Sequence, residues 1–193
     1  MCICCGQPFP SGKDHLCGDC VRSTFSFVRA RSLFEYSEPI RSLLTGFKFG
    51  GNLALLDTLS TLALAHDVHH IVREPDLILP VPLHVSRLRQ RGFNQSLLLA
   101  KACFSVWQER LKVDALCRIR PTVPQTALSG KARRNNLKGA FGLQRKELIK
   151  GQKILLVDDV FTTGATLQEC TAVLVAGGAD SVEAFTLARV VKQ

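Results

Sequence analysis

The chain has 193 residues, of which 46% are hydrophobic and 21% are charged. These proportions are typical of a soluble globular protein and argue against a disordered or fibrous chain. The length suits one ordinary domain with a small appendage. A formal net charge of +9 favours a phosphate-rich partner such as a nucleotide, a sugar pyrophosphate or a nucleic acid, although a merely soluble basic surface has the same composition.

Two segments bear on the cellular location. Met1 to Cys5 has neither the basic region nor the apolar region of a signal peptide. The longest apolar stretch, residues 53–65, is interrupted by Asp57 and by hydroxyl residues, and it is shorter than the roughly 20 residues of a membrane-spanning helix. We therefore expect a cytoplasmic protein with no membrane span.

Five of the eight cysteines lie within the first twenty residues. Four of them form two Cys-x-x-Cys pairs, a spacing that brings two thiolates of one turn to the same tetrahedral Zn²⁺. The expected ligands of this structural zinc site are Cys2, Cys5, Cys17 and Cys20. Disulfide pairing is the alternative, which a cytosolic chain disfavours, and Cys4 could replace Cys2 as a ligand. We place a boundary near Thr24, which gives a zinc knuckle of residues 1–24 and a second domain of residues 25–193.

Strand and helix patterns alternate beyond residue 24. Apolar residues with helical spacing predict helices over residues 38–49, 53–72, 93–111 and 166–176. Short apolar runs predict strands over residues 77–82, 116–120, 140–143, 153–158 and 182–191. The run 154–157 is continuously apolar, as expected for a strand covered on both faces of a parallel sheet. The alternation predicts an α/β domain with a mostly parallel sheet flanked by helices.

The most informative segment joins the strand at 153–158 to the helix at 166–176. Asp158 and Asp159 end the buried run, at the edge where open α/β sheets bind ligands. The following turn offers threonine hydroxyls and helix-N-terminal amides to an anion, and Gly164 lets the backbone approach a ligand closely. Carboxylates beside an anion cradle suit a phosphorylated polyol. A strand–turn–helix with solvated acids is the alternative, but two acids that end a buried strand need a reason.

This segment resembles the signature with which type I phosphoribosyltransferases bind 5-phosphoribosyl-1-pyrophosphate (PRPP): four apolar residues, two acids and a threonine–glycine turn. By that resemblance, Asp158 and Asp159 hold the ribose 2′- and 3′-hydroxyls. The residues that hold the 5′-phosphate are then Thr162, Thr163, Gly164, Ala165 and Thr166. In purine-salvage enzymes of this fold, an acid within the turn can act as a base toward the incoming purine. Thr162 occupies that position here and cannot act as a base, so purine salvage is not expected.

Two basic loops complete the expected site. Arg87, Arg89 and Arg91 alternate in a loop that leaves the strand at 77–82 through a rigid proline turn. A second, longer polar loop contains Arg133 and Arg134 and is a candidate lid over the ligand. Arginine forks suit pyrophosphate oxygens, so in this fold both loops are expected to neutralise pyrophosphate together with Mg²⁺. Solvated surface charge is the alternative for both loops.

The chain as a whole resembles the ComF (ComFC/GntX-like) family of phosphoribosyltransferase-fold proteins. The resemblance covers nearly the whole length and rests on several motifs in one order. They are the two Cys-x-x-Cys pairs, Phe47-Lys48-Phe49-Gly50-Gly51, the stretch from Pro80 to Gln95, Pro-Gln-x-x-Leu-Ser followed by Arg-x-Asn, and the stretch from Val157 to Thr166. It implies a type I phosphoribosyltransferase (Rossmann-like) fold with a small N-terminal Cys4 zinc knuckle.

The same resemblance implies a role in natural competence and DNA utilisation, with single-stranded DNA and other DNA-uptake proteins as partners. One hypothesis is a PRPP-binding factor that assists the uptake or cytoplasmic handling of single-stranded DNA. Another is an active phosphoribosyltransferase with an unknown acceptor, since both acids and the arginine loops are present. A third makes the zinc knuckle a docking module for another protein. One Trp and one Tyr beside eleven mostly core-like Phe argue against an extensive base-stacking platform.

Overall fold

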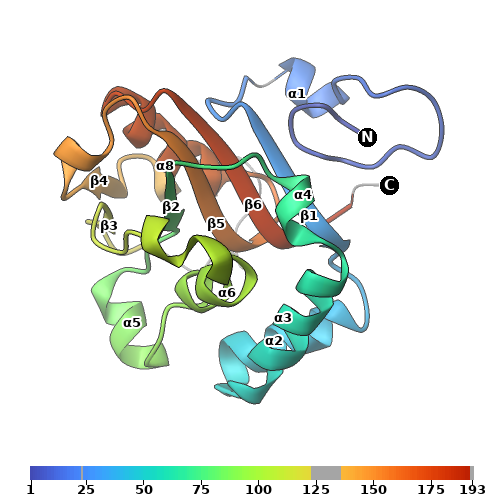
Figure 1. Ribbon diagram of the computed structural model, residues 1–193, viewed down its shortest axis with the longest axis horizontal. Coiled ribbons are helices and arrows are strands. Elements are labelled where there is room, and N and C mark those ends of the chain that lie inside the picture. The colour runs from blue at the N-terminus through green and yellow to red at the C-terminus, as the bar shows by residue number, and fades with distance from the viewer. Residues whose placement is uncertain (23, 123–135, 192–193) are drawn as a thin grey trace.

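A four-stranded parallel sheet forms the centre of the protein (Figure 1). The computed structural model describes residues 1–22, 24–122 and 136–191. The strands of the sheet are β1 (Arg29–Glu35), β2 (Leu77–Pro80), β5 (Lys153–Phe161) and β6 (Ser181–Arg189), in the spatial order β1-β6-β5-β2. Each neighbouring pair is parallel, which confirms the predicted α/β domain.

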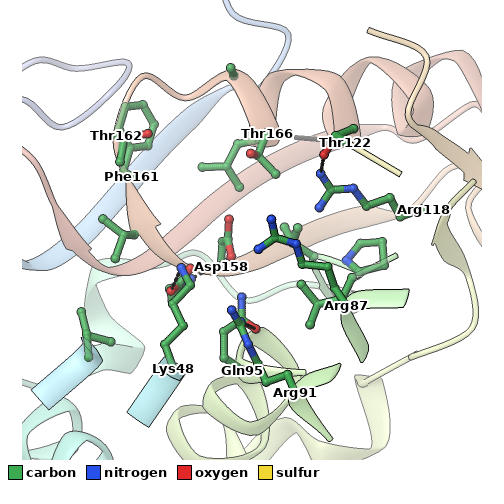
Figure 2. Close-up of a pocket in the computed structure, with 18 of the residues that line it drawn as sticks. Lys48, Arg87, Arg91, Gln95, Arg118, Thr122, Asp158, Phe161, Thr162 and Thr166 are labelled. Carbon is green, nitrogen blue, oxygen red and sulfur yellow. Dashed lines mark hydrogen bonds and ion pairs between the residues drawn. The ribbon is translucent and has the colours of Figure 1, made fainter. Parts of the chain in front are cut away.

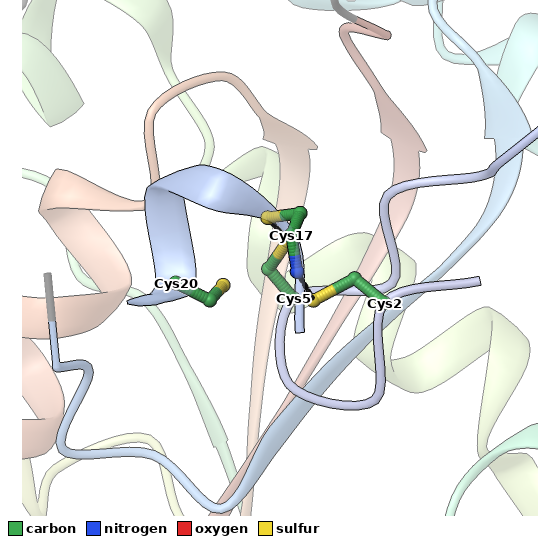
Figure 3. Close-up of side chains that lie close together, drawn as sticks. All are labelled: Cys2, Cys5, Cys17 and Cys20. Carbon is green, nitrogen blue, oxygen red and sulfur yellow. Dashed lines mark hydrogen bonds between the residues drawn. The ribbon is translucent and has the colours of Figure 1, made fainter. Parts of the chain in front are cut away.

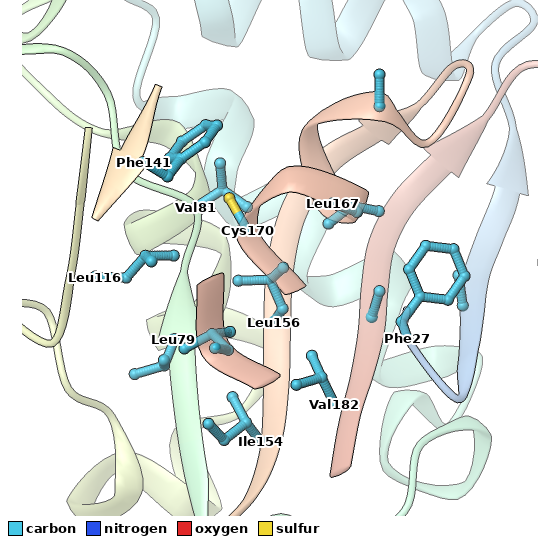
Figure 4. Packing of buried hydrophobic residues seen from close by; sticks show 14 of the residues in the cluster. Phe27, Leu79, Val81, Leu116, Phe141, Ile154, Leu156, Leu167, Cys170 and Val182 are labelled. Atoms are coloured by element: carbon cyan, nitrogen blue, oxygen red, sulfur yellow. The ribbon is translucent and has the colours of Figure 1, made fainter. Parts of the chain in front are cut away.

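Strand β5 shows why the sheet is buried on both faces. Its apolar residues alternate between two hydrophobic clusters: Ile154 and Leu156 belong to one, and Leu155 and Val157 belong to the other. All four side chains are at most 2% exposed. Figure 4 shows the first cluster, which packs between the sheet and helix α8 (Ala165–Ala176). The continuous apolar run is therefore explained by cover on both faces, as predicted.

Helices cover the two faces of the sheet. Residues of α2, α3 and α6 pack into the same cluster as Leu155, and α8 lies on the opposite face (Figure 1). The remaining helical bounds are α1 (Gly18–Arg22), α2 (Ile40–Gly50), α3 (Ala54–Ala65), α4 (Val68–Ile71), α5 (Val85–Arg91), α6 (Gln95–Cys103), η1 (Ser105–Arg110) and η3 (Lys146–Leu148). Within the described ranges, no helix is long and apolar enough to cross a membrane.

Two of the predicted helices are divided in the structure. The segment 53–72 is broken where Asp67 adopts a left-handed conformation, with φ 54°, between α3 and α4. The segment 93–111 contains α6, but the chain leaves the α-helix after Cys103 and continues as the short 3-10 helix η1. The spacing of apolar residues runs across both breaks, so it does not reveal them.

Two further elements differ from the sequence-based expectation. Strand β1 is not predicted, because its sequence Arg-Ala-Arg-Ser-Leu-Phe-Glu mixes charge into a partly exposed strand. The segment that contains Arg87, Arg89 and Arg91 is predicted as a loop but forms helix α5. The predicted short strands are present: β3 (Leu116–Arg118) and β4 (Phe141–Leu143) pair antiparallel in a second, two-stranded sheet.

The amino-terminal segment packs directly against β1. The amide of Ala30 donates to the carbonyl of Cys4 (2.7 Å), and the side chain of Arg31 donates to the carbonyl of Ile3 (3.2 Å). Three of the amino-terminal cysteines belong to the same hydrophobic cluster as Phe27, so the segment contributes to the core of the protein. The division into residues 1–24 and 25–193 remains a prediction.

Candidate functional site

A cavity of about 300 Å³ opens at the carboxyl ends of β2 and β5. Figure 2 shows that its side chains come from α2, α5, α6, β3, β5 and the turn into α8. The charged residues that line it are Lys48, Arg87, Arg91, Arg118, Asp158 and Asp159. Four cations and two carboxylates therefore share one cavity, which favours a polyanionic ligand.

The two carboxylates are buried within β5, which continues to Phe161 rather than ending at Asp158. Asp158 is 8% exposed and Asp159 is 3% exposed. The hydroxyl of Ser96 donates to Asp158 Oδ1 (2.8 Å), and Lys48 Nζ lies 2.5 Å from Asp159 Oδ2. One hydroxyl from α6 and one ammonium group from α2 thus compensate for the loss of water around these acids.

The two acids titrate differently. Burial, reinforced by the neighbouring Asp159 carboxylate, raises the pKa of Asp158 to about 7. Burial also acts to raise the pKa of Asp159, but the ammonium group of Lys48 outweighs it, so that this pKa is lowered. For Lys48, burial acts to lower the pKa, and the Asp159 carboxylate more than compensates and raises it. At neutral pH, Asp159 is therefore charged, whereas Asp158 keeps its proton to a higher pH than an ordinary aspartate does.

The turn between β5 and α8 contributes to the wall of the cavity. Gly164 precedes α8 with φ 75°, and a Cβ at this position would lie 2.7 Å from Cζ of Phe161, so glycine is required. Four of the five predicted turn residues line the cavity: Thr162, Gly164, Ala165 and Thr166. The side chain of Thr163 is outside that lining, and its buried hydroxyl has no hydrogen-bond partner among the described residues.

Only two of the three alternating arginines line the cavity. Arg87 and Arg91 are one helical turn apart on α5 and both face the cavity (Figure 2), whereas Arg89 is exposed and outside its lining. The structure thus places Arg87 and Arg91, but not Arg89, at the cavity, because residues four apart share one face of a helix and residues two apart do not. Arg133 and Arg134 lie outside the described residues.

Three residues of the site are not predicted from the sequence: Lys48 and Arg118, which line the cavity, and Ser96, which is fully buried and donates to Asp158. Lys48 lies 111 positions before its partner Asp159. Arg118, on β3, lines the cavity and donates a hydrogen bond to Thr122. The available signal for Lys48 is its place in the motif Phe47-Lys48-Phe49-Gly50-Gly51, whereas Arg118 and Ser96 carry no such signal.

The start of α6 fixes two of the polar groups at the cavity. Asn94 accepts a hydrogen bond from the amide of Ser96 (3.0 Å), and its own amide group donates to the carbonyl of Val81 (3.1 Å). This cap places the Ser96 hydroxyl against Asp158. It also places the buried side chain of Gln95 beside Arg91, and Arg91 donates a hydrogen bond to Gln95 Oε1 (2.6 Å).

Four cysteines in the amino-terminal segment form a group that can bind a metal ion (Figure 3). The Sγ atoms of Cys2, Cys5, Cys17 and Cys20 all lie within 4.8 Å of one another. Those of Cys5 and Cys17 are 3.7 Å apart, near the ~3.8 Å expected between two ligands in a tetrahedron of ~2.3 Å Zn–S bonds. The amide of Cys17 donates to Cys2 Sγ (3.3 Å), which suits a thiolate ligand. The structure thus brings together the four predicted ligands, without Cys4.

Arg189 joins this four-cysteine group to the wall of the cavity. Its side chain is 6% exposed and donates to the carbonyl of Cys5 and to Gln7 Oε1 (2.7 Å). The guanidinium carbon lies 5.1 Å from the ring centroid of Phe161, which lines the cavity. The backbone at Cys5 and the end of β5 are therefore held by the same side chain.

Known proteins are similar to this chain along nearly its whole length. DNA utilization protein YhgH of Escherichia coli O6:H1 is 34% identical over 194 residues, which cover 98% of this chain and 84% of that protein. Competence protein F of Haemophilus influenzae is 34% identical over 191 residues, which cover 96% and 82%. The chain belongs to the ComF family.

Two further comparisons agree with this ComF assignment. Competence protein ComFC of Bacillus subtilis is 29% identical over 201 residues, which cover 98% of this chain and 78% of that protein. A phosphoribosyl transferase domain model matches residues 110–192. The predicted fold is therefore confirmed: a phosphoribosyltransferase domain with a parallel sheet flanked by helices, and a four-cysteine group at the amino terminus.

Replacing each acid by its amide should change stability in opposite directions. Because the pKa of Asp158 is raised to about 7 in the native state, wild-type protein loses stability as the pH rises from about 4 to about 7. Asp158→Asn lacks this loss, so its free energy of unfolding relative to wild type should rise over that interval, by roughly 2 to 4 kcal/mol, and stay constant above it.

The matched variant is Asp159→Asn. The lowered pKa of Asp159 contributes stability that is present above about pH 4 and is lost as the pH falls through the native pKa, so this variant should be less stable than wild type at neutral pH. Urea denaturation from pH 4 to pH 8 measures both variants. A pH-independent difference between Asp158→Asn and wild type would contradict the assignment.

Proposed function

We propose that this chain binds PRPP with Mg²⁺ in the cavity at the carboxyl end of β5 and holds a structural Zn²⁺ in the four-cysteine group. The proposal rests on one arrangement: two buried carboxylates lie beside a threonine–glycine turn, and four cations line the same cavity. Carboxylates suit vicinal hydroxyls, the turn suits a monophosphate and the arginines suit a pyrophosphate. PRPP carries all three groups in one molecule.

Each group of residues has a part in this proposal. Asp158 and Asp159 accept hydrogen bonds from the ribose hydroxyls, while Arg87 and Arg91 neutralise the pyrophosphate together with Mg²⁺. Arg89 is left out of this role because it lies outside the cavity lining. The 5′-phosphate is assigned to Thr162, Thr163, Gly164, Ala165 and Thr166. The contribution of Arg133 and Arg134 stays a prediction.

The names of the relatives extend the proposal to DNA. They are called competence protein F and DNA utilization protein YhgH. We infer that this chain assists the uptake or cytoplasmic handling of single-stranded DNA, in company with other DNA-uptake proteins. The net charge of +9 supports direct contact with a phosphate backbone.

The alternative is an active phosphoribosyltransferase with an unknown acceptor. The observation that favours it is the retention of both acids and of two arginines around an open cavity. Thr162 cannot take a proton from the acceptor near neutral pH, so in this alternative either the acceptor is already a good nucleophile or another group of the cavity takes the proton. Pyrophosphate release from PRPP and Mg²⁺, screened over bases, amines and nucleic acids, distinguishes turnover from binding alone.

Calorimetric titration should show that wild-type protein binds PRPP in the presence of Mg²⁺. The double variant Asp158→Asn/Asp159→Asn should lose this binding, because amides accept hydrogen bonds from the ribose hydroxyls less strongly than carboxylates do. Arg87→Ala should weaken binding roughly 10- to 100-fold, the usual effect of losing a hydrogen bond between charged groups.

Arg89→Ala is the matched control, since it removes the same charge from the same helix outside the cavity lining. It should bind PRPP as wild type does. Circular dichroism confirms that each variant is folded. The absence of binding by folded, metal-loaded wild-type protein would refute the proposed ligand.

Freshly purified, reduced protein should contain about one Zn²⁺ per chain, which a chelator releases. Cys5→Ser should lose the metal, because Cys5 contributes one of the four clustered Sγ atoms. Cys4→Ser should retain it, since Cys4 is outside that group. Metal analysis by mass spectrometry measures all three proteins, and a metal-free wild type would rule out the zinc site.

Single-stranded DNA should bind to the full chain with an affinity that falls steeply between 50 and 200 mM salt, by roughly 10-fold or more, because binding releases counterions from the phosphates. Fluorescence anisotropy of a labelled oligothymidylate measures this dependence. Polyglutamate of similar length is the control for unspecific attraction between charges and should compete poorly. If the strand does not bind even at low salt, direct DNA contact is wrong.

A further inference from the structure

The cavity has an exposed aromatic residue at its mouth that PRPP does not require. Phe49 lines the cavity and is 64% exposed, whereas Phe47, two positions earlier on α2, is fully buried. A single exposed apolar side chain is ordinary on a protein surface. What distinguishes Phe49 is that it lies at a charged cavity and that two cations stand against its ring.

Helix α2 holds this ring in place. Ile40, Leu44 and Phe47 form the buried stripe of the helix, and Phe47 packs against Phe93 with 5.4 Å between ring centroids. Phe49 lies outside that stripe, and the helix ends directly after it, with Gly51 in the left-handed conformation at φ 63°. The exposed ring is therefore presented from an anchored helical turn, which keeps the entropic cost of using it low.

Two cations connect the ring to the charged part of the cavity. The guanidinium carbon of Arg91 lies 5.3 Å from the ring centroid of Phe49, and Lys48 Nζ lies 5.9 Å from it. Both cations are fixed by polar partners in the cavity, Arg91 by Gln95 and Lys48 by Asp159. An aromatic surface and two ordered positive charges are thus available within a few ångströms of one another.

A nucleotide matches this combination. Its base presents a flat π-face, and stacking of a base on one aromatic side chain is worth about 1–3 kcal/mol. When no PRPP pyrophosphate occupies the guanidinium group of Arg91, the phosphate of the nucleotide can pair with it. An aliphatic ligand would leave the cations unused, and a simple sugar phosphate would leave the ring unused. The small number of exposed aromatic residues argues against a long stacking platform, but one ring suffices for one base.

We propose that Phe49, together with Arg91 and Lys48, forms a stacking subsite for the base of a nucleotide at the mouth of the phosphoribosyl cavity. The subsite deepens the function proposed above and rests on it, since it places a nucleotide beside the PRPP site. A free mononucleotide and the end of a single DNA strand offer the same base and phosphate.

The test uses the full, metal-loaded chain and two fluorescent probes. They are 2-aminopurine deoxyriboside 5′-monophosphate and an oligothymidylate with 2-aminopurine at its 5′-phosphorylated end, each titrated with and without PRPP and Mg²⁺. Stacking on Phe49 should quench the 2-aminopurine fluorescence. Phe49→Ala should weaken binding roughly 10-fold and remove the quenching, and Phe49→Trp should restore both.

Leu53→Ala is the control, because Leu53 is similarly exposed, at 51%, and lies outside the cavity lining. It should behave as wild type with both probes. Binding of the mononucleotide supports a small-molecule ligand, and binding of the oligonucleotide alone supports a strand end. Equal affinity and quenching in wild type and Phe49→Ala would overturn the subsite, as would failure of Phe49→Trp to restore them or of wild type to bind either probe.

The outcome is separable from that of the proposed function. If wild-type protein binds PRPP but neither probe depends on Phe49, the subsite is wrong and the PRPP site stands. If the probes depend on Phe49 but PRPP does not bind, the cavity holds a nucleotide and the PRPP proposal is wrong.

Discussion

Two neighbouring carboxylates at the end of a buried strand are the constraint on which the rest of this structure depends. Unpaired acids at the depth of Asp158 and Asp159 would be strongly destabilising. Their partners come from α6 and α2, two helices that pack into the same hydrophobic cluster. Each helix carries both the apolar residues that pack into this cluster and the polar group that contacts an acid. The packing of the helices and the charge state of the acids therefore depend on each other.

Positive charges outnumber negative charges among the side chains that line the cavity. Asp159 is held charged by Lys48, and Asp158 has a pKa of about 7. Against them stand three arginines besides Lys48. The PRPP proposed above would supply negative charge to this cavity, and its phosphates would reduce the mutual repulsion of the cations.

The parts of the site that the sequence predicted are local in the chain. Strand β5, the turn at Gly164 and α8 are contiguous, and each cysteine pair lies within four residues, so their geometry follows from spacing. The partnership of Lys48 with Asp159 crosses 111 positions, and no local pattern encodes such a distance.

The position of Arg89 outside the cavity lining could not be predicted for a different reason. Its alternation with Arg87 and Arg91 has the period of a strand or an extended loop, whereas the chain forms a helix there and turns Arg89 away from the cavity. Strand β1 is not predicted because charged residues interrupt its apolar pattern. The face that a side chain such as Arg89 occupies depends on the element that forms around it.

The contact between the amino-terminal segment and β1 has a consequence for self-association. β1 is an edge strand, and the amide of Ala30 is paired with the carbonyl of Cys4 rather than with another strand. An uncovered edge offers unpaired amides and carbonyls to a second chain. The loop that carries Cys4 is folded around the four-cysteine group, so an ion bound there, as proposed above, would hold this cover in place. Loss of such an ion, or oxidation of the thiols, would then expose the edge to strand-to-strand aggregation.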